Sequence, residues 1–360
     1  MCAKSATMRD IAKAANVSQS TVSMILNGKS ASFPDATIER VLQTAAAMNY
    51  AYRRPAPKAT NGTVLVITVQ YTNPYYANML QGIDRAAKLQ DISVVSGCTY
   101  HDPDTEEKLL NMAIEHKYLG VIYMYPPDNE DAFRKAKQNI PIVTICDRAS
   151  NVSGDIVELN NFHAGVLAAR HLLDMGHENI AILTHSSDRS TTSRATRLAG
   201  ILSEIKKDLP EDRLLLLNGN NSKTGYLSEN SFHYQVGYSL AQSKKLYQGN
   251  ITGLICVNDM LAYGVMNALI EKGYRIPEDF SVIGSDNLLF SNMSGVSLTT
   301  IEHYPDVVAQ SALTTLLNRV RMTGSTMSAT RFQVQCQPSL LIRGSTGPVR
   351  THELPHPTKG

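Results

Sequence analysis

From residue 63 to residue 283 the chain alternates short β-branched runs with helical stretches. The apolar runs are 64–69, 93–96, 120–124, 142–145, 180–183, 253–257 and 280–283. The helical stretches between them include 76–90, 105–116, 164–175 and 260–272. Strands that alternate with helices predict parallel sheets joined by right-handed crossovers. Two such units in tandem, about 62–160 and 161–290, predict an α/β body of two lobes.

A helical segment precedes this body. Residues 8–26 predict two short helices with apolar stripes at helical spacing, joined by a tight turn. Asn16 stands where the first helix must end in a left-handed residue, and Ser18 is placed to cap the second helix. A third amphipathic helix is expected over about 35–49. The pattern is typical of a helix-turn-helix unit, although a generic helical hairpin has the same periodicity.

Charge divides the chain near the same place. Residues 1–58 hold eight Lys or Arg against three acidic residues, whereas the rest of the chain holds 26 against 29. A basic head on a slightly acidic body suits nucleic-acid binding by the head. No stretch approaches the ~18 consecutive apolar residues of a membrane helix, and the polar N-terminus has no signal-peptide core. We therefore expect a cytoplasmic protein without membrane contact.

Motifs for cofactor, metal or catalytic chemistry are missing from the sequence. It contains no GxGxxG after the first strand, no P-loop and no GxSxG elbow. The five cysteines are far apart without CxxC spacing, which predicts reduced, buried thiols. His171 and His177 are six residues apart, off the i,i+4 spacing of helical metal ligands. We expect no cofactor, no metal and no enzymatic activity.

Specific motifs extend this interpretation. The run MRDIAKAANVSQSTVSMILNGK, residues 8–29, contains a V-S-x-x-T-V-S core and resembles the head of the lactose/galactose repressor (LacI/GalR) family. The blocks NNFHAG (160–165), RLAG (197–200) and IPEDFSVIGSDN (276–287) carry the resemblance to about Ser345. It implies a transcriptional repressor with a periplasmic-binding-protein-like body, whose two lobes clamp a small effector.

The resemblance also implies the domain boundaries. The expected parts are a helix-turn-helix head over 1–50, a linker over 51–61, an effector domain over 62–342 and a disordered tail over 343–360. Because the chain of this fold crosses between lobes three times, lobe one is expected to hold 62–160 and 288–325. Lobe two is expected to hold 161–287 and 326–342, including a last strand near 333–342.

The DNA contacts are carried over position by position. Gln19 and Ser20 open the recognition helix and are expected to face base edges, whereas Thr21 and Ser23 touch phosphates or polar groove edges. Many relatives have an arginine where this chain has Met24, so the operator is expected to differ there, with Met24 free to contact a thymine methyl. The complete set of predicted DNA-binding residues is Thr7, Ser18, Gln19, Ser20, Thr21, Ser23, Met24, Asn27, Lys29, Arg53 and Arg54.

The linker departs from the family pattern. Most relatives have a hinge helix that pushes leucines into the minor groove. Here the segment 50–62 has no leucine, and Pro55 and Pro57 disfavour a helix. We expect no leucine-wedge hinge helix. Arg53, Arg54 and Lys58 then form either an extended arm on phosphates or a plain interdomain linker.

The effector is expected at the carboxyl ends of the strands, where open α/β sheets bind ligands. Carboxylate, amide and guanidinium groups can hold vicinal hydroxyls while an aromatic face packs on a ring, so the set suits a sugar-like ligand. Each residue has a plainer alternative: Tyr76 as core packing, Asp147 as an ion pair with Arg148, Asn258 as a helix cap and His185 as a bystander. The predicted effector-binding residues are Asn73, Tyr75, Tyr76, Asp147, Ser193, Arg197, Phe232, Asn258 and Asp286.

Two other functions share parts of this pattern. A plain solute-binding protein has the same body but needs neither the basic head nor a cytoplasmic location. A cytoplasmic sugar-acting enzyme could use Asp147 and Asp286 as an acid–base pair, yet no nucleophile or cofactor motif accompanies them. The tail lacks leucine heptads, so we expect a homodimer that binds a roughly palindromic double-stranded DNA operator.

Overall fold

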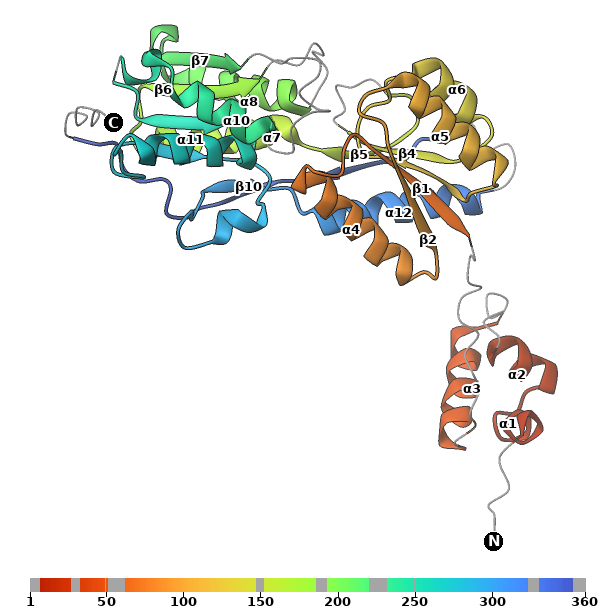
Figure 1. The fold of residues 1–360 in the computed structure, drawn as a ribbon. Helices are drawn as coiled ribbons and strands as arrows, with labels where there is room; N and C mark the ends of the chain where they lie inside the picture. Colours follow the sequence, from red (N-terminus) through yellow and green to blue (C-terminus); the bar gives the residue numbers. More distant parts are fainter. Residues whose placement is uncertain are drawn as a thin grey trace. The chain divides into compact units, whose positions relative to one another are not determined.

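The computed structural model describes residues 7–26, 33–48, 50, 62–146, 152–185, 193–219, 232–248, 250–322 and 330–351. The chain forms two compact units that divide between Asn61 and Gly62. We call the first unit the head and the second the body (Figure 1). Within the described ranges, no helix has both the length and the apolar character needed to cross a membrane.

The head is a three-helix unit around a small apolar core. Its helices are α1 (Met8–Ala14), α2 (Gln19–Leu26) and α3 (Asp35–Ala47). Asn16 adopts the expected left-handed conformation, with φ 52°. Ser18 Oγ accepts a hydrogen bond from the backbone N–H of Thr21 at 3.0 Å, which confirms the predicted cap of the second helix. The core side chains come from all three helices: Ile11, Ala12, Ala15, Val22, Ile25, Leu26, Val41 and Ala45.

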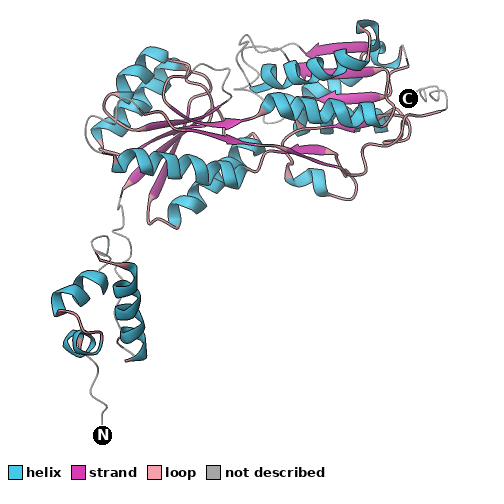
Figure 2. Ribbon diagram, turned by 180° about the vertical axis from the view of Figure 1, so that it is seen from behind, coloured by secondary structure: helices cyan, strands magenta, loops and turns pink. Residues whose placement is uncertain are grey.

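Lobe one of the body is a six-stranded, wholly parallel sheet in the order β11-β5-β4-β3-β1-β2. Helices α4 (Pro74–Lys88) and α12 (Pro305–Arg321) pack on one face, and α5 (Pro103–Glu115) and α6 (Glu130–Lys137) pack on the other. Figure 2 shows these strands between the two helical layers. The strands are β1 (Thr63–Thr68), β2 (Ser93–Cys98), β3 (Gly120–Tyr123), β4 (Ile142–Cys146), β5 (Asp155–Leu159) and β11 (Gln333–Cys336).

Lobe two has a four-stranded parallel sheet in the order β7-β6-β8-β9. Helices α7 (Asn161–Asp174) and α8 (Ser193–Asp208) pack on one face, and α10 (Phe232–Ala241) and α11 (Asp259–Glu271) pack on the other. The strands are β6 (Ile180–His185), β7 (Leu214–Gly219), β8 (Gly253–Cys256) and β9 (Ser281–Ile283). The 3-10 turns are η2 (Glu211–Arg213), η3 (Lys244–Tyr247) and η4 (Leu289–Asn292).

The crossings between lobes differ from the predicted boundaries. The expected last strand is two strands: β11 pairs with β5 in lobe one, and β12 (Ser339–Leu341) pairs antiparallel with β10 (Thr300–Glu302). The chain also remains with lobe two beyond residue 288, because Leu298 and Ile301 lie in that lobe's cores. The return to lobe one comes with α12. The family resemblance implied one strand here, and local hydrophobic periodicity does not identify the sheet that a strand joins.

The predicted disordered tail is wrong for residues 343–351, which pack on lobe two. Ser345, Thr346 and Gly347 are buried. Ser345 accepts from the Val282 backbone N–H through its carbonyl at 2.8 Å, and its own N–H donates to the Ser297 carbonyl at 2.9 Å. Hydrogen bonds of backbone and hydroxyl groups hold this segment, and such contacts leave no apolar periodicity in the sequence. Residues 352–360 lie outside the described residues.

Glycine permits a close crossing of α7 and α8. A Cβ on Gly200 would lie 2.0 Å from the Phe162 carbonyl oxygen, and one on Gly165 would lie 2.1 Å from the Arg197 carbonyl oxygen. Both obstacles are backbone atoms, which cannot move aside as a side chain can. The two glycines therefore set the distance between the helices and, through α8, the position of Arg197.

We expect Gly200→Ala to lower the free energy of unfolding by about 3 kcal/mol, because the helices must separate to admit the methyl group. Urea denaturation followed by circular dichroism measures this loss. Gly295→Ala is the matched control, since a Cβ there meets no atom within 4 Å. Equal stability of the two variants would contradict the close crossing.

Candidate functional site

The second helix of the head presents a polar face. Gln19 and Ser20 are exposed, Met24 is 39% exposed, and Thr21 and Ser23 are half-buried. The apolar residues of α2 face the head core instead, so the polar side chains lie on the opposite side of the helix. Ser18 Oγ lies 2.7 Å from the hydroxyl oxygens of both Ser20 and Thr21, which orders the start of the helix.

Thr7 has a structural role at the start of α1. Its hydroxyl lies 2.6 Å from Asp10 Oδ2 and its N–H donates to the same oxygen at 2.8 Å, forming a capping box. The cap positions the first helix whether or not Thr7 also touches DNA. The predicted DNA contacts Asn27, Lys29, Arg53 and Arg54 lie outside the described residues.

One cavity in the body collects side chains from both lobes. Seven of the nine predicted effector residues line it: Asn73, Tyr75, Tyr76, Ser193, Arg197, Asn258 and Asp286. Asp147 lies outside the described residues. Phe232 is not among the described lining residues; its ring packs edge-on against His185 and His233, at centroid distances of 5.7 and 5.6 Å. The cavity also exposes polar residues that the sequence interpretation missed: Gln70, His101, Tyr125, Asn161, Arg194, His233 and His303.

The start of α4 forms part of the lobe-one wall. Asn73 caps the helix by accepting from the Tyr75 N–H at 3.0 Å, and Pro74 occupies the first helical position. The rings of Tyr75 and Tyr76 meet edge to face, with centroids 5.4 Å apart. Tyr76 also packs against both apolar cores of lobe one. The residue therefore contributes to core packing and also lines the cavity.

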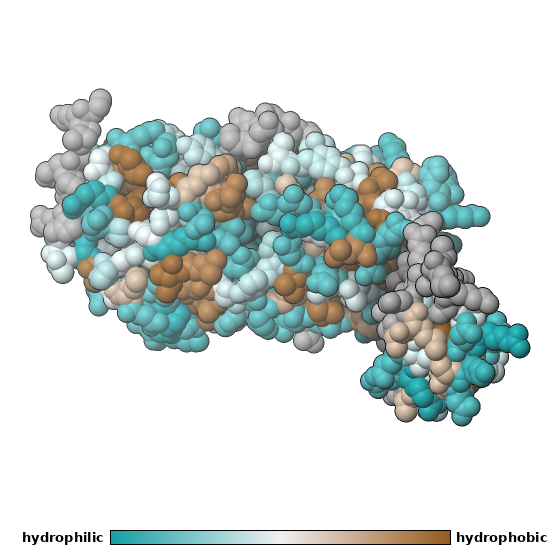
Figure 3. Space-filling model, turned by 90° about the horizontal axis from the view of Figure 1, so that it is seen from below, coloured by the Kyte–Doolittle hydropathy of each residue, from teal (hydrophilic) through white to brown (hydrophobic). Residues whose placement is uncertain are grey.

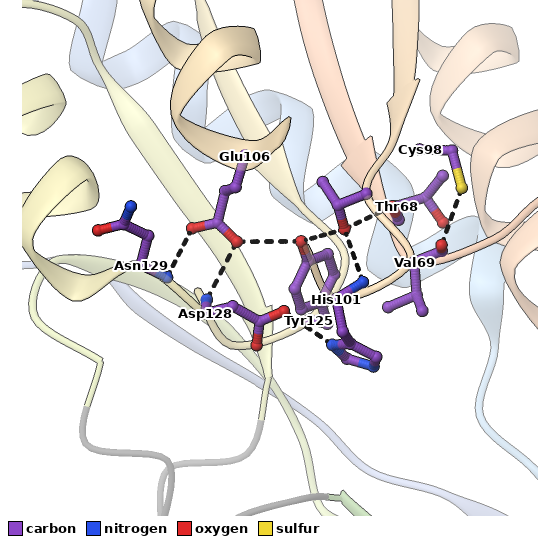
Figure 4. Close-up of polar contacts among 9 residues, drawn as sticks. Thr68, Val69, Cys98, His101, Glu106, Tyr125, Asp128 and Asn129 are labelled. Carbon is purple, nitrogen blue, oxygen red and sulfur yellow. Dashed lines mark hydrogen bonds and ion pairs between the residues drawn. The ribbon is translucent and has the colours of Figure 1, made fainter. Parts of the chain in front are cut away.

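A buried carboxylate positions the rest of the lobe-one wall (Figure 4). Glu106 accepts from the Tyr125 hydroxyl at 3.1 Å and from the backbone N–H groups of Asp128 and Asn129 at 3.0 and 3.2 Å. His101 Nδ1 lies 2.8 Å from Asp128 Oδ2. Burial, and then the charge of Glu106, raises the pKa of Tyr125, so its hydroxyl remains a donor. Glu106 thereby holds the loop that brings Tyr125 to the cavity.

Arg197 dominates the lobe-two wall and is only 7% exposed. Its Nε and Nη2 donate to Asn161 Oδ1 at 3.1 and 2.6 Å, and its Nη1 donates to the Val257 carbonyl. Its Nη2 also lies 3.3 Å from His303 Nε2. Burial, and then the charge of Arg197, lowers the pKa of His303 well below its usual value, so His303 accepts as a neutral imidazole.

Asp286 lies near Arg197 on the same wall and has an unusual backbone. Its φ of 139° is in a region that residues other than glycine rarely adopt. Its N–H donates to the Ile301 carbonyl at 3.0 Å, which fixes the backbone next to β10. Burial raises the pKa of the carboxyl well above its usual value, and the charge of Arg197 opposes this rise only in part. Strain and a displaced pKa at a cavity wall are features of functional sites.

Asn258 faces the cavity, but its amide is occupied by protein atoms. Oδ1 accepts from the Leu261 N–H at 2.8 Å and caps α11, and Nδ2 lies 2.7 Å from His233 Nδ1. The helix-cap alternative for Asn258 is therefore confirmed. The side chain that it supports, His233, gives no sequence signal of its own beyond lying next to Phe232.

A helix-turn-helix head followed by a two-lobed α/β body with a polar cavity lined from both lobes defines a class of DNA-binding regulators. The family model described as "Bacterial regulatory proteins, lacI family" matches residues 7–52, and that of a "Periplasmic binding protein-like domain" matches residues 169–346. The transcriptional repressor PurR of Mannheimia succiniciproducens is 31% identical over 346 residues, covering 94% of this chain and 98% of that protein. A PurR of Haemophilus influenzae is 30% identical over 349 residues, with the same coverage.

Solved structures of other proteins have a similar fold. A LacI family regulator from Enterococcus faecium with bound ribose is 25% identical, with a TM-score of 0.66 over 80% of this chain and 100% of that chain. The lac repressor dimer bound to operator and the anti-inducer ONPF, at 22% identity, has the same fold, with a TM-score of 0.65 over 96% of this chain and 100% of that one. This chain belongs to the LacI/GalR family and is a DNA-binding transcriptional repressor. The same relatives favour a regulator over the enzyme alternative.

Proposed function

We propose that this repressor responds to a small, hydroxyl-rich, sugar-like effector held in the cavity between its lobes. The carrying observation is the pairing of Arg197 and Asp286 on one wall with Tyr75 and Tyr76 on the other. Among the described residues the Asp286 carboxyl accepts no hydrogen bond, so its oxygens are available to a ligand hydroxyl. Arg197 is held in place by neutral partners. A guanidinium and a carboxyl group on one wall, facing aromatic rings on the other, suit a polar ring with apolar faces.

Binding of such a ligand would connect the lobes. The residues that contact it come from α4 in lobe one and from α8 and the β9–β10 connection in lobe two. An effector can shift an equilibrium between lobe arrangements only by its differential affinity, typically ~1–3 kcal/mol. That free energy is sufficient to change operator affinity by roughly 5- to 150-fold.

The effector proposal is tested by thermal-shift and calorimetric titration of the full chain with a panel of pentoses, hexoses and nucleosides. We expect Arg197→Gln to weaken binding of the selected ligand about 10- to 100-fold, because a charge-assisted hydrogen bond is lost. Arg213→Gln, an exposed position on the same lobe, is the control. If a nucleoside binds and no sugar does, the effector is a nucleoside and the sugar-like class is wrong. If Arg197→Gln binds the ligand with unchanged affinity, Arg197 does not contact the effector.

We further propose that the repressor acts as a homodimer on a roughly palindromic operator. Helix-turn-helix units of this type read two half-sites with two heads. The body also exposes large apolar side chains around η4, namely Leu289, Phe290 and Met293. Apolar patches among polar ones are visible on the face shown in Figure 3. Sedimentation of the full chain would show a monomer if this proposal is wrong.

Operator binding is tested by selecting bound sequences from a random duplex pool at stated salt. An enriched palindrome is expected, and Gln19→Ala should weaken its binding by about 1–3 kcal/mol while leaving non-specific binding unchanged. Lys135→Gln, an exposed body position, controls for a general change of charge. Equal loss on specific and non-specific DNA would show that Gln19 contacts the phosphate backbone and no base edge.

A further inference from the structure

One histidine in the cavity wall has a ring nitrogen with no hydrogen-bond partner in the described part of the chain. His233, at the start of α10, is 8% exposed and lines the cavity. Its Nδ1 lies 2.7 Å from Asn258 Nδ2. Its Nε2 is buried and has no hydrogen-bond partner among the described residues. Which of the two ring nitrogens carries the hydrogen decides what the cavity offers a ligand at this point.

The capping role of Asn258 fixes the orientation of its amide. Leu261 N–H points at Oδ1 from 2.8 Å, and an N–H can only donate. Rotating the amide by 180° would place Nδ2 against that N–H, two donors facing each other. Nδ2 therefore faces His233, and because an amide nitrogen only donates, His233 Nδ1 must accept.

The acceptor role of Nδ1 places the single hydrogen of a neutral imidazole on Nε2. Burial, and then the charge of Arg194, lowers the pKa of His233 to about 3, so the ring stays neutral at pH 7. The packing of its ring against His185, at a centroid distance of 4.6 Å, limits reorientation. A buried donor without a partner destabilises the unliganded cavity, and a ligand acceptor would recover that free energy.

We propose that His233 determines effector specificity: Asn258 holds it with the hydrogen on Nε2, so the effector must place a hydrogen-bond acceptor there. Hydroxyl, ether and carbonyl oxygens and unprotonated ring nitrogens satisfy this requirement, whereas ammonium and amide N–H groups do not. The inference rests on the function proposed above for the cavity. Asn258 is then a positioning residue, and His233 is the group that touches the ligand.

The tautomer is measured without any ligand. In the full chain labelled with ¹⁵N-histidine, long-range ¹H–¹⁵N spectra at pH 7 are expected to show a protonated Nε2 and an unprotonated Nδ1 for His233. The resonances are assigned by their loss in His233→Gln. Asn258→Ser keeps a capping hydroxyl but removes the donor to Nδ1, and it is expected to yield a mixture of tautomers. A wild-type ring protonated on Nδ1 overturns the proposal.

The ligand contact is measured with D-ribose and uridine as probes. Gln at position 233 accepts from Asn258 through Oε1 and leaves its own N–H₂ as a donor, so His233→Gln is expected to keep affinity within about threefold. His233→Met removes the donor, and at least tenfold weaker binding is expected. Equal affinity of His233→Met and wild type overturns the contact. If neither probe binds wild type, D-ribose and uridine are excluded as effectors, while the measured tautomer still decides whether the cavity presents a donor.

Discussion

Truncation of the chain after Ile342 is expected to lower the free energy of unfolding of the body by about 5 kcal/mol. The removed segment contributes Ser345, whose hydroxyl donates to the Val282 carbonyl at 2.6 Å and accepts from the Thr299 N–H at 2.8 Å. It also contributes the carbonyl of Gly347, which lies 3.1 Å from His177 Nε2. Each buried group left without its partner costs about 1–3 kcal/mol, so several such losses exceed the effect of most single substitutions.

The matched control is a chain that ends after Thr351, which keeps the segment 343–351 and removes residues 352–360. Urea denaturation followed by far-ultraviolet circular dichroism compares the two truncations with the full chain. We expect the chain that ends after Thr351 to unfold at the same urea concentration as the full chain. The chain that ends after Ile342 is expected to unfold at a lower urea concentration. If both truncations match the full chain, the packing of residues 343–351 on lobe two makes no contribution to stability.

Local signals in the sequence correctly predicted the helices of the head and the alternation of strands and helices in the body. Asn16 and Ser18 identified the turn and the cap of the helix-turn-helix, because both depend on residues within one turn of the chain. The predicted starts of α4 and α5 were two residues late. Pro74 and Pro103 stand at the first helical position of these helices, where proline is tolerated and the apolar stripe has not yet begun.

Long-range pairing was not predictable in the same way. Strands β5 and β7 were missed. Strand β11 was assigned to the wrong lobe because its sheet partner, β5, lies far away in the sequence. The hydrogen-bond networks of buried polar side chains were also not predictable from the sequence. Nothing local indicates that Glu106 supports Tyr125 or that the amide of Asn258 turns toward His233. Family motifs predicted Arg197 and Asp286 at the cavity, whereas the lining histidines at positions 101, 233 and 303 became visible only in the structure.

Replacing Asp259 by Ala is expected to destabilise lobe two by about 3–5 kcal/mol and to weaken effector binding. The carboxylate is fully buried at the start of α11 and accepts three hydrogen bonds. They come from the Leu288 N–H at 2.8 Å, the Ser291 hydroxyl at 2.6 Å and the Thr300 hydroxyl at 2.5 Å. Alanine leaves the Leu288 N–H and the Thr300 hydroxyl without their acceptor, at about 1–3 kcal/mol each before any water enters. The Ser291 hydroxyl keeps only the Tyr263 hydroxyl, 2.7 Å away. Asp212→Ala, at an exposed position of the same lobe, is expected to change stability by less than about 0.5 kcal/mol.

Asp259→Asn separates the loss of hydrogen bonds from the loss of charge. The amide oxygen can still accept from Leu288 and Ser291, and the Thr300 hydroxyl can turn to accept from the new N–H₂. Burial raises the pKa of Asp259, so the surroundings of this carboxyl act against its charged form. We therefore expect Asn to recover most of the stability lost with Ala in urea denaturation. If Asn destabilises as much as Ala, the negative charge itself holds the segment that carries Asp286, and effector binding should then fall equally in both variants.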